Sequence, residues 1–305
     1  MHIKNPRLTC SKSYCIEELM KPEKRALIVG GGGLRGAYAV GVLRKIYDYG
    51  GPDLFDTIYT VSVGVYASTF FLAHQVETME NTWKYYVHGS QLINFANILK
   101  GEPILGLDYL ESIFKSKRSY LDVDKVINSK QNLYYVLTDY DTGKPEYFNA
   151  KSHYIFDMMK ASSALPCVYP KPIIIKGRRY FDGGASDPIP INKALSDGFK
   201  DIYLVLTRPD GFERKPTLKI VPLLCIRSKG ARNALYRLHD VYNQSENLIR
   251  SIKNNPQGIN LTVFRPKQIK VTRFTRDQTA LIEAIEQGKR DAEEVMSSMK
   301  IERSC

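Results

Sequence analysis

A run of four glycines separates a short apolar segment from a helix-like one in LIVGGGGLRGAY, residues 27–38. RALIVG (25–30) has the length and apolar character of a buried strand, and LRGAYAVGVLRKIYDYG (34–50) has the spacing of an amphipathic helix. A strand, a tight turn and a helix form the first half of a β-α-β unit. Because glycine leaves the backbone bare, this turn is also a candidate site for a phosphate or an oxyanion.

The rest of the chain continues this alternation. DTIYTVSV (56–63) reads as a second strand and GVYASTFFLAH (64–74) as a nearly all-apolar helix. NLYYVLTDYDTGKPEYFNA (132–150) predicts a hairpin about its Asp-Thr-Gly turn, and DIYLVLTR (201–208) predicts another buried strand. We therefore predict the α/β class, with a mainly parallel sheet covered by helices on both faces.

A soft boundary falls near TRPDGFERKP (207–216), after which the pattern becomes mainly helical. We expect an N-terminal lead segment at 1–24, a core at 25–210, and a mainly helical region at 211–305 that packs on the core.

The charge and the cysteines bear on partners and location. The chain has 44 basic and 32 acidic residues, a net charge of +12, which suits an anionic bilayer, a lipid headgroup or a nucleic acid without choosing among them. No apolar run is long enough for a transmembrane helix, and the first 25 residues lack the apolar core of a signal peptide. The five cysteines are an odd number without metal-ligand spacing, so we expect free thiols, no metal site and a cytoplasmic protein.

Two interpretations of the glycine run compete. Gly31, Gly33 and Gly36 fit the G-x-G-x-x-G pattern of dinucleotide-binding turns. That pattern also requires an acidic residue at the end of the second strand, whereas Asp53 and Asp56 precede the strand here.

The second strand instead ends in TVSVG (60–64), which places Ser62 at a sharp strand-to-helix turn. Such a turn lifts a serine hydroxyl clear of a sheet for nucleophilic attack, although a serine between apolar residues is often only a buried hydroxyl. IIIKGRRYFDGGASDPIP (173–190) predicts a hairpin that delivers Asp182 into Gly183 and Gly184, where an aspartate also commonly caps a turn.

Four segments together resemble the patatin-like phospholipases, in particular their bacterial group. These are GGGGLRG, TVSVG, ASSALPCVYP (161–170) and DGGASDPIPI, in that order, within a match from about Arg25 to Arg208. VFRPKQIKVTRFTRD (263–277) also resembles the C-terminal region of that group.

The resemblance implies a three-layer α/β/α fold and a serine lipid acyl hydrolase of the phospholipase A, lysophospholipase or carboxylesterase type. Ser62 is then the nucleophile and Asp182 its base, in a Ser-Asp dyad that uses no metal or organic cofactor. The nucleophile turn is framed by Thr60 and Gly64, and Gly183 and Gly184 support the aspartate. The implied oxyanion hole comprises Gly31, Gly32, Gly33, Leu34, Arg35 and Gly36.

The chain departs from the family pattern at the nucleophile turn. Thr60 replaces the usual first glycine, and Val63 replaces the usual alanine after the serine. Because β-branched side chains crowd such a turn, we expect a distorted turn or a narrowed pocket. A weak or inactive lipid-binding relative therefore remains an alternative, and a nucleotide-binding α/β protein a more distant one.

Basic residues provide the remaining expectations. Arg35 either orients a headgroup phosphate or, as we favour, fixes the glycine loop through a salt bridge. The clusters KGRR (176–179) and KSKR (115–118) are candidates for peripheral contact with an anionic membrane. No specific nucleic-acid partner is expected, and nothing in the sequence indicates an oligomeric state.

Overall fold

One eight-stranded sheet organises the molecule. The computed structural model describes residues 24–218 and 220–304, so the predicted lead segment lies outside the described residues except for its last position. The strand order is β5-β6-β3-β2-β1-β7-β8, and β4 pairs with β3. The strands are β1 (Arg25–Val29), β2 (Thr57–Val61), β3 (Asn132–Asp139), β4 (Pro145–Asn149), β5 (Ile173–Ile175), β6 (Arg178–Asp182), β7 (Asp201–Val205) and β8 (Asn260–Phe264).

The five strands β3, β2, β1, β7 and β8 run parallel to one another, whereas β4 and β6 run antiparallel to β3. Strands β2 and β7 are buried at every position, as expected for parallel strands covered on both faces. The predicted hairpins are β3–β4 and β5–β6. The predicted mainly parallel sheet is confirmed.

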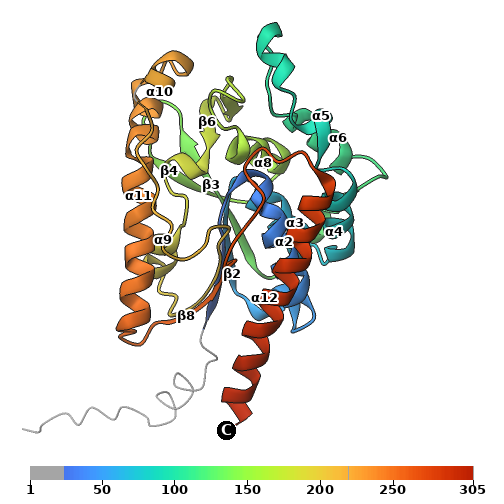
Figure 1. The fold of residues 1–305 in the computed structure, drawn as a ribbon, viewed down its shortest axis with the longest axis vertical. Helices are drawn as coiled ribbons and strands as arrows, with labels where there is room; N and C mark the ends of the chain where they lie inside the picture. The colour runs from blue at the N-terminus through green and yellow to red at the C-terminus, as the bar shows by residue number, and fades with distance from the viewer. Residues whose placement is uncertain (1–23, 219, 305) are drawn as a thin grey trace, which may run out of the picture.

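Helices cover both faces of the sheet (Figure 1). On one face a large core packs under helices including α2, α3, α4 and α12, and on the other a second core packs under α9 and α11. These helices are α2 (Gly36–Tyr47), α3 (Gly64–Leu72), α4 (Val76–Tyr85), α9 (Ile191–Ser196), α11 (Lys229–Asn254) and α12 (Gln278–Ser304). The predicted three-layer fold is therefore confirmed.

Shorter helices surround the end of the sheet at which the parallel strands finish, at the top of Figure 1. They are α5 (Gly89–Leu92), α6 (Leu107–Phe114), α8 (Ile155–Ser163) and α10 (Ile220–Cys225), whereas α7 (Val123–Ile127) comes directly before β3, at the end where the parallel strands start. The 3-10 helices are η1 (Gly33–Arg35), η2 (Gly51–Leu54), η3 (Phe95–Lys100) and η4 (Gly183–Ala185). No helix among the described residues is long and apolar enough to cross a bilayer.

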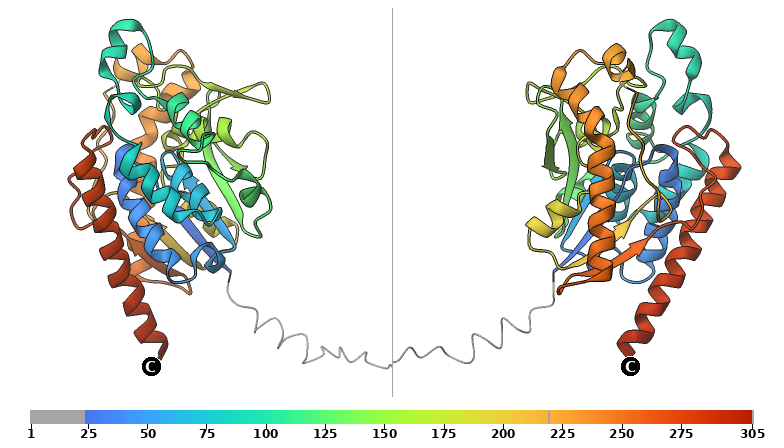
Figure 2. Two further views of the ribbon diagram at one scale, coloured as in Figure 1. Left: turned by 90° about the vertical axis from the view of Figure 1, so that its right-hand side faces the viewer. Right: turned by 60° about the vertical axis from the view of Figure 1, so that its left-hand side comes forward.

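The last two elements of the chain join structures built by the first part. β8 pairs along its whole length with β7, and α12 lies along α2, as the two views of Figure 2 also show. The two helices approach closely at Gly41 and Gly288, since a Cβ at either glycine would overlap a backbone carbonyl of the other helix. The division of the chain near residue 210 remains a prediction. β8 follows that position in the sequence, but it pairs with β7 and extends the same sheet.

The prediction of free thiols is wrong at one position. Cys167 is disulfide-bonded.

Candidate active site

The turn after β2 holds Ser62 in a left-handed conformation, with φ 55°. This conformation is unfavourable for a residue with a side chain and persists where the surroundings impose it. A Cβ at Gly64 would lie 2.8 Å from both Thr60 Oγ1 and Val29 O, so the next residue but one must be glycine. The backbone N–H of Ser62 donates to Ser162 Oγ at 2.9 Å, which secures the turn from the side of α8.

Ser162 was not singled out by the sequence, although its segment was. Its hydroxyl donates in turn to Val136 O at 2.8 Å, so that β3 holds Ser162 and Ser162 holds Ser62. The ASSALP segment was recognised as a motif, but Ser162 and Ser163 stand side by side in it. The sequence alone gave no reason to choose Ser162 as the one that holds the turn.

Asp182, the last residue of β6, faces Ser62. The Ser62 hydroxyl donates to Asp182 Oδ2 at 3.0 Å, and the Gly184 N–H donates to Oδ1 at 2.8 Å. The aspartate therefore both caps the η4 turn and meets the serine, one oxygen for each contact. A Cβ at Gly183 would overlap the carbonyl of Val136, which explains the first of the two glycines.

Burial raises the pKa of the Asp182 carboxyl to about 6. The hydrogen bonds from Gly184 and Ser62 and the positive charges of Arg273 and Arg214 act in the opposite direction, but desolvation is the larger effect. A carboxylate with this pKa is a stronger base than an exposed one and is still ionised at neutral pH.

The glycine loop after β1 lies against Ser62. A Cβ at Gly31 would lie 2.8 Å from Ser62 Cβ, and Gly33 has φ 59°, so both positions favour glycine. Among the described residues, no acceptor takes the backbone N–H of Gly31, Gly32 or Gly33. These three donors are the part of the predicted oxyanion hole that the geometry leaves open.

Two of the predicted donors are occupied. The Leu34 N–H donates to Arg273 O at 3.1 Å, and the Gly36 N–H donates to the carbonyls of Gly33 and Leu34. The inclusion of Leu34 and Gly36 as free donors was therefore wrong, because the loop uses these groups to hold its own shape. The contact to Arg273 also shows that the C-terminal region supports the loop.

Thr207, two residues after the end of β7, fixes the other side of the loop and was missed from the sequence. Its hydroxyl donates to Gly31 O at 2.7 Å, and a Cβ at Gly32 would overlap that hydroxyl. Its position just after a predicted strand could have indicated this role, because the carboxyl ends of neighbouring parallel strands meet at one edge of a sheet.

The predicted distortion at Thr60 and Val63 is not observed, since Ser62 keeps its left-handed φ. Thr60 is fully buried, where its hydroxyl accepts a hydrogen bond from Ser68 at 3.2 Å. Val63 packs against Gly36, where a Cβ would lie 2.9 Å from Val63 Cγ1. Glycine at position 36 thus leaves room for the valine.

The comparisons with known proteins agree with this arrangement. The family model "Patatin-like phospholipase" matches residues 27–195, which hold the glycine loop, Ser62 and Asp182. The chain belongs to the patatin-like phospholipase family. A second model, a domain of unknown function (DUF6363), matches residues 229–301.

Individual relatives are more distant. The Escherichia coli K12 protein YjjU, itself uncharacterized, is 27% identical over 192 residues, which cover 62% of this chain and 53% of that protein. The chain thus matches about half the length of this curated relative.

Two solved structures are similar only at a coarse level. VipD from Legionella pneumophila has a TM-score of 0.49 at 12% identity, covering 91% of this chain and 67% of that chain. The ExoU–SpcU complex of Pseudomonas aeruginosa has a TM-score of 0.30 at 14% identity, covering 93% of this chain and 61% of that chain. Both likenesses are too weak to bear on function.

In this patatin-like chain, Ser62 and Asp182 line a cavity whose walls are apolar on the side of helices α3 to α6. The apolar lining includes Tyr66, Trp83, Val87, Leu92, Leu105, Leu107, Leu110, Phe114 and Leu165. Burial of apolar surface is the main source of affinity for a hydrocarbon chain.

Arginines line another part of the same cavity: Arg35, Arg208, Arg214 and Arg273. The salt bridge favoured for Arg35 is absent, since no carboxylate among the described residues lies within 4 Å of any of these four guanidinium groups.

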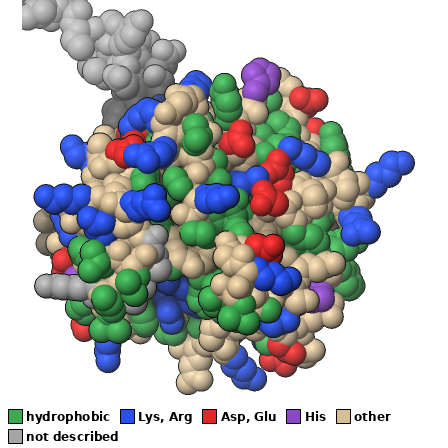
Figure 3. Space-filling model, turned by 90° about the horizontal axis from the view of Figure 1, so that it is seen from above, with side chains coloured by type: hydrophobic (Ala, Val, Ile, Leu, Met, Phe, Trp, Pro, Cys, Tyr) green, Lys and Arg blue, Asp and Glu red, His purple; other side chains and the backbone are tan. Residues whose placement is uncertain are grey.

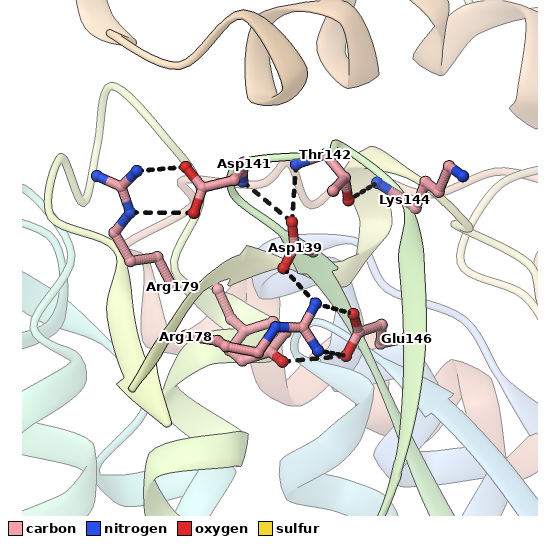
Figure 4. Close-up of polar contacts among 8 residues, drawn as sticks. Asp139, Asp141, Thr142, Lys144, Glu146, Arg178 and Arg179 are labelled. Atoms are coloured by element: carbon pink, nitrogen blue, oxygen red, sulfur yellow. Dashed lines mark hydrogen bonds and ion pairs between the residues drawn. The ribbon is translucent and has the colours of Figure 1, made fainter. Parts of the chain in front are cut away.

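The basic cluster of the β5–β6 hairpin is arranged in the opposite way (Figure 4). Arg178 pairs with Asp139 at 2.7 Å and with Glu146, and Arg179 pairs with Asp141. Seen from above, the molecule shows basic and acidic side chains interspersed with apolar ones (Figure 3). The two arginines of KGRR are therefore already paired within the protein, whereas the membrane contact predicted for KSKR stays a prediction.

Proposed function

We propose that this chain hydrolyses carboxylic ester bonds of lipids, with Ser62 as the nucleophile and Asp182 as the general base. The observation that carries the proposal is the 3.0 Å hydrogen bond from Ser62 Oγ to Asp182 Oδ2, at a left-handed turn beside three unoccupied backbone donors. Membership of the patatin-like phospholipase family supports the same reaction.

In the first half of this reaction, Asp182 accepts the proton of Ser62 Oγ as that oxygen attacks the ester carbonyl carbon. The carbonyl oxygen becomes an oxyanion, which the N–H groups of Gly31, Gly32 and Gly33 are positioned to stabilise. When the tetrahedral intermediate collapses, the ester C–O bond breaks, the leaving alcohol takes the proton from Asp182, and the acyl group stays on Ser62.

In the second half, Asp182 takes a proton from a water molecule as its oxygen attacks the acyl carbon. Collapse of this second intermediate returns the proton to Ser62 and releases a fatty acid. Asp182 thus carries a proton twice, first from Ser62 to the leaving alcohol and then from water back to Ser62.

We assign contact with a lipid surface to the exposed apolar side chains of η3 and α10. The β5–β6 hairpin is not chosen, because its arginines are paired with carboxylates. In η3, Leu99 is 92% exposed and Ile98 60%, and in α10, Leu224 is 77% exposed. Both elements lie at the end of the molecule where the parallel strands finish (Figure 1). Exposed leucines at such positions favour insertion between lipid headgroups.

Labelling with a fluorophosphonate probe tests the proposal directly, because the probe reacts only with an activated serine. The wild-type protein and a control at the exposed Ser112, Ser112→Ala, should be labelled, whereas Ser62→Ala should not be, with its circular dichroism unchanged. Equal labelling of Ser62→Ala, or turnover of a soluble ester by that variant at the wild-type rate, would refute the assignment. A wild-type protein that binds lipid but is neither labelled nor active would instead be a non-catalytic lipid-binding relative.

A further inference from the structure

Four arginines distant in sequence converge on the cavity of Ser62. Arg35 comes from η1, Arg208 and Arg214 from the segment between β7 and α10, and Arg273 from the segment between β8 and α12. Each arginine brings a full positive charge, and among the described residues that line this cavity Asp182 is the one carboxylate.

Arg35 is buried and the other three arginines are half-buried, and none has a carboxylate partner among the described residues. Arg35 is 4% exposed, and the Nε atoms of Arg35 and Arg214 are buried without a hydrogen-bond partner among the described residues. Burial, together with repulsion from the neighbouring arginines, lowers the pKa of Arg35 to about 9 and that of Arg214 to about 10. Like charges brought together in a protein interior destabilise the fold, so an arrangement of this kind indicates a site for an anion.

Neighbouring groups hold the arginines in place. The Arg208 guanidinium lies 4.1 Å from the centre of the Phe212 ring. The backbone of Arg214 exchanges two hydrogen bonds with the Asn243 side chain of α11, at 2.9 and 3.1 Å. A site that is fixed before binding loses less entropy when its ligand arrives.

Arg35 connects the cluster to the proposed reaction centre. Its Nη2 atom lies 3.3 Å from the position that a Cβ at Gly32 would occupy, so the guanidinium lies beside the proposed oxyanion donors. In glycerophospholipids the phosphate and the ester carbonyls are separated by only a few bonds. A phosphate at the arginines is therefore placed to leave an ester carbonyl near Ser62.

We propose that the four arginines bind the phosphate of a lipid headgroup, and that the preferred substrates carry a terminal phosphate monoester. This inference rests on the proposed lipid hydrolase function. A monoester phosphate carries up to two negative charges and presents several acceptor oxygens to guanidinium groups, whereas a diester carries one. Among the described residues that line the cavity, the one carboxylate, Asp182, already meets Ser62, so none is left for the ammonium group of a choline or ethanolamine headgroup.

Three lipids with the same oleoyl chain test this preference: lysophosphatidate, lysophosphatidylcholine and monooleoylglycerol, each in mixed micelles with a neutral detergent. We expect kcat/KM to be highest for lysophosphatidate. Arg214→Gln and Arg273→Gln should each lower the ratio of lysophosphatidate to monooleoylglycerol turnover by about tenfold or more.

Arg179→Gln is the matched control, since it removes the same charge from an arginine paired with Asp141 on the hairpin. It should leave the ratio unchanged. An equal ratio in wild type and both pocket variants, or a wild-type preference for lysophosphatidylcholine, would overturn the inference.

Binding separates this inference from the proposed catalysis. Ser62→Ala retains all four arginines and should bind lysophosphatidate in calorimetry at least tenfold more tightly than monooleoylglycerol. If it does so while the wild-type protein hydrolyses none of the three lipids, the reaction is wrong and the phosphate site stands. If wild type hydrolyses the lipids but Ser62→Ala does not discriminate between them, the phosphate site is wrong.

Inorganic phosphate distinguishes the two sources of the anion. We expect it to bind Ser62→Ala much more weakly than lysophosphatidate, because the apolar wall contributes nothing to its affinity. Binding of both with the same affinity would indicate a site for a free anion and overturn the assignment to a headgroup.

Discussion

Two groups of arginines in this protein have opposite structural roles. Arg178 and Arg179 stand in KGRR, the densest basic cluster near Asp182, yet both are paired with carboxylates on the outside of the molecule. The four pocket arginines are scattered along the chain, yet converge without a carboxylate partner among the described residues. Anion binding therefore follows from unpaired charge, which depends on the fold, and not from the density of basic residues in a sequence.

The largest loss of activity should come from replacing Asp182, whose carboxylate lines the same cavity as the four pocket arginines. Asp182→Asn keeps the size of the side chain and removes the base, so we expect kcat to fall by at least about 1000-fold on soluble esters and lipids alike. The pocket arginine variants should instead change turnover according to the headgroup. Asp182→Asn with more than a tenth of wild-type kcat on a soluble ester would show that another group is the base.

Gly33 in the glycine loop and Gly177 in the β5–β6 hairpin allow a matched comparison of the two regions. Gly33 has φ 59°, and a Cβ there would lie 2.7 Å from Arg273 O, so Gly33→Ala should displace the Arg273 segment. We expect kcat/KM for lysophosphatidate to fall by about 10- to 100-fold. The expected cause is this displacement, since the added methyl group points at Arg273 and not at the oxyanion.

Gly177→Ala is the control for that change. Gly177 has a similar φ of 76°, but no atom lies within 4 Å of its Cβ position in the turn of the paired hairpin. It should cost stability without altering kcat/KM. Equal losses of activity in the two variants would mean that backbone strain, and not the position of Arg273, causes the effect.

The pH profile provides a third comparison. Asp182 acts as a base only when it is deprotonated, so kcat/KM for a soluble ester should fall as the pH decreases through about 6. The positive charge of Arg273 lowers the pKa of Asp182, and therefore Arg273→Gln should move this acid limb to higher pH. Arg178→Gln should leave the limb in place, and a profile that does not move in Arg273→Gln would contradict the coupling between the cluster and the base.

The smallest effect is expected on the hairpin itself. The arginine side chains are about half exposed, and the buried Asp139 keeps its hydrogen bonds from the backbone of Asp141 and Thr142. The Arg178→Gln/Arg179→Gln double variant should therefore lower Tm by only a few degrees, about 5 °C at most. Its sedimentation with anionic vesicles should match that of wild type, whereas Leu99→Gln/Leu224→Gln should sediment less. A large loss of vesicle binding in the hairpin variant alone would restore KGRR as the membrane contact.

The sequence predicted those parts of the site that depend on local geometry. Ser62 and Asp182 stand in turns that require glycine at fixed offsets, so short sequence motifs are enough to identify them. The alternation of strands and helices predicted the layered sheet. The free donors at Leu34 and Gly36 were predicted wrongly because a backbone pattern does not reveal which N–H groups the loop uses internally.

What the sequence could not reveal depends on contacts between distant segments. Thr207 and Ser162 act through neighbouring strands, and the partners of Arg35, Arg178 and Arg179 depend on which segments the fold brings together. A favourable local partner for Arg35 was assumed, whereas its surroundings consist of other arginines.

The hydrogen bond from Leu34 N–H to Arg273 O, at 3.1 Å, also bears on when the pocket becomes complete. The ribosome synthesises the glycine loop, Ser62 and Asp182 well before it reaches Arg273, because the chain emerges from its N-terminus. A nascent or prematurely terminated chain that ends before this residue lacks one wall of the cavity and the anchor of its glycine loop.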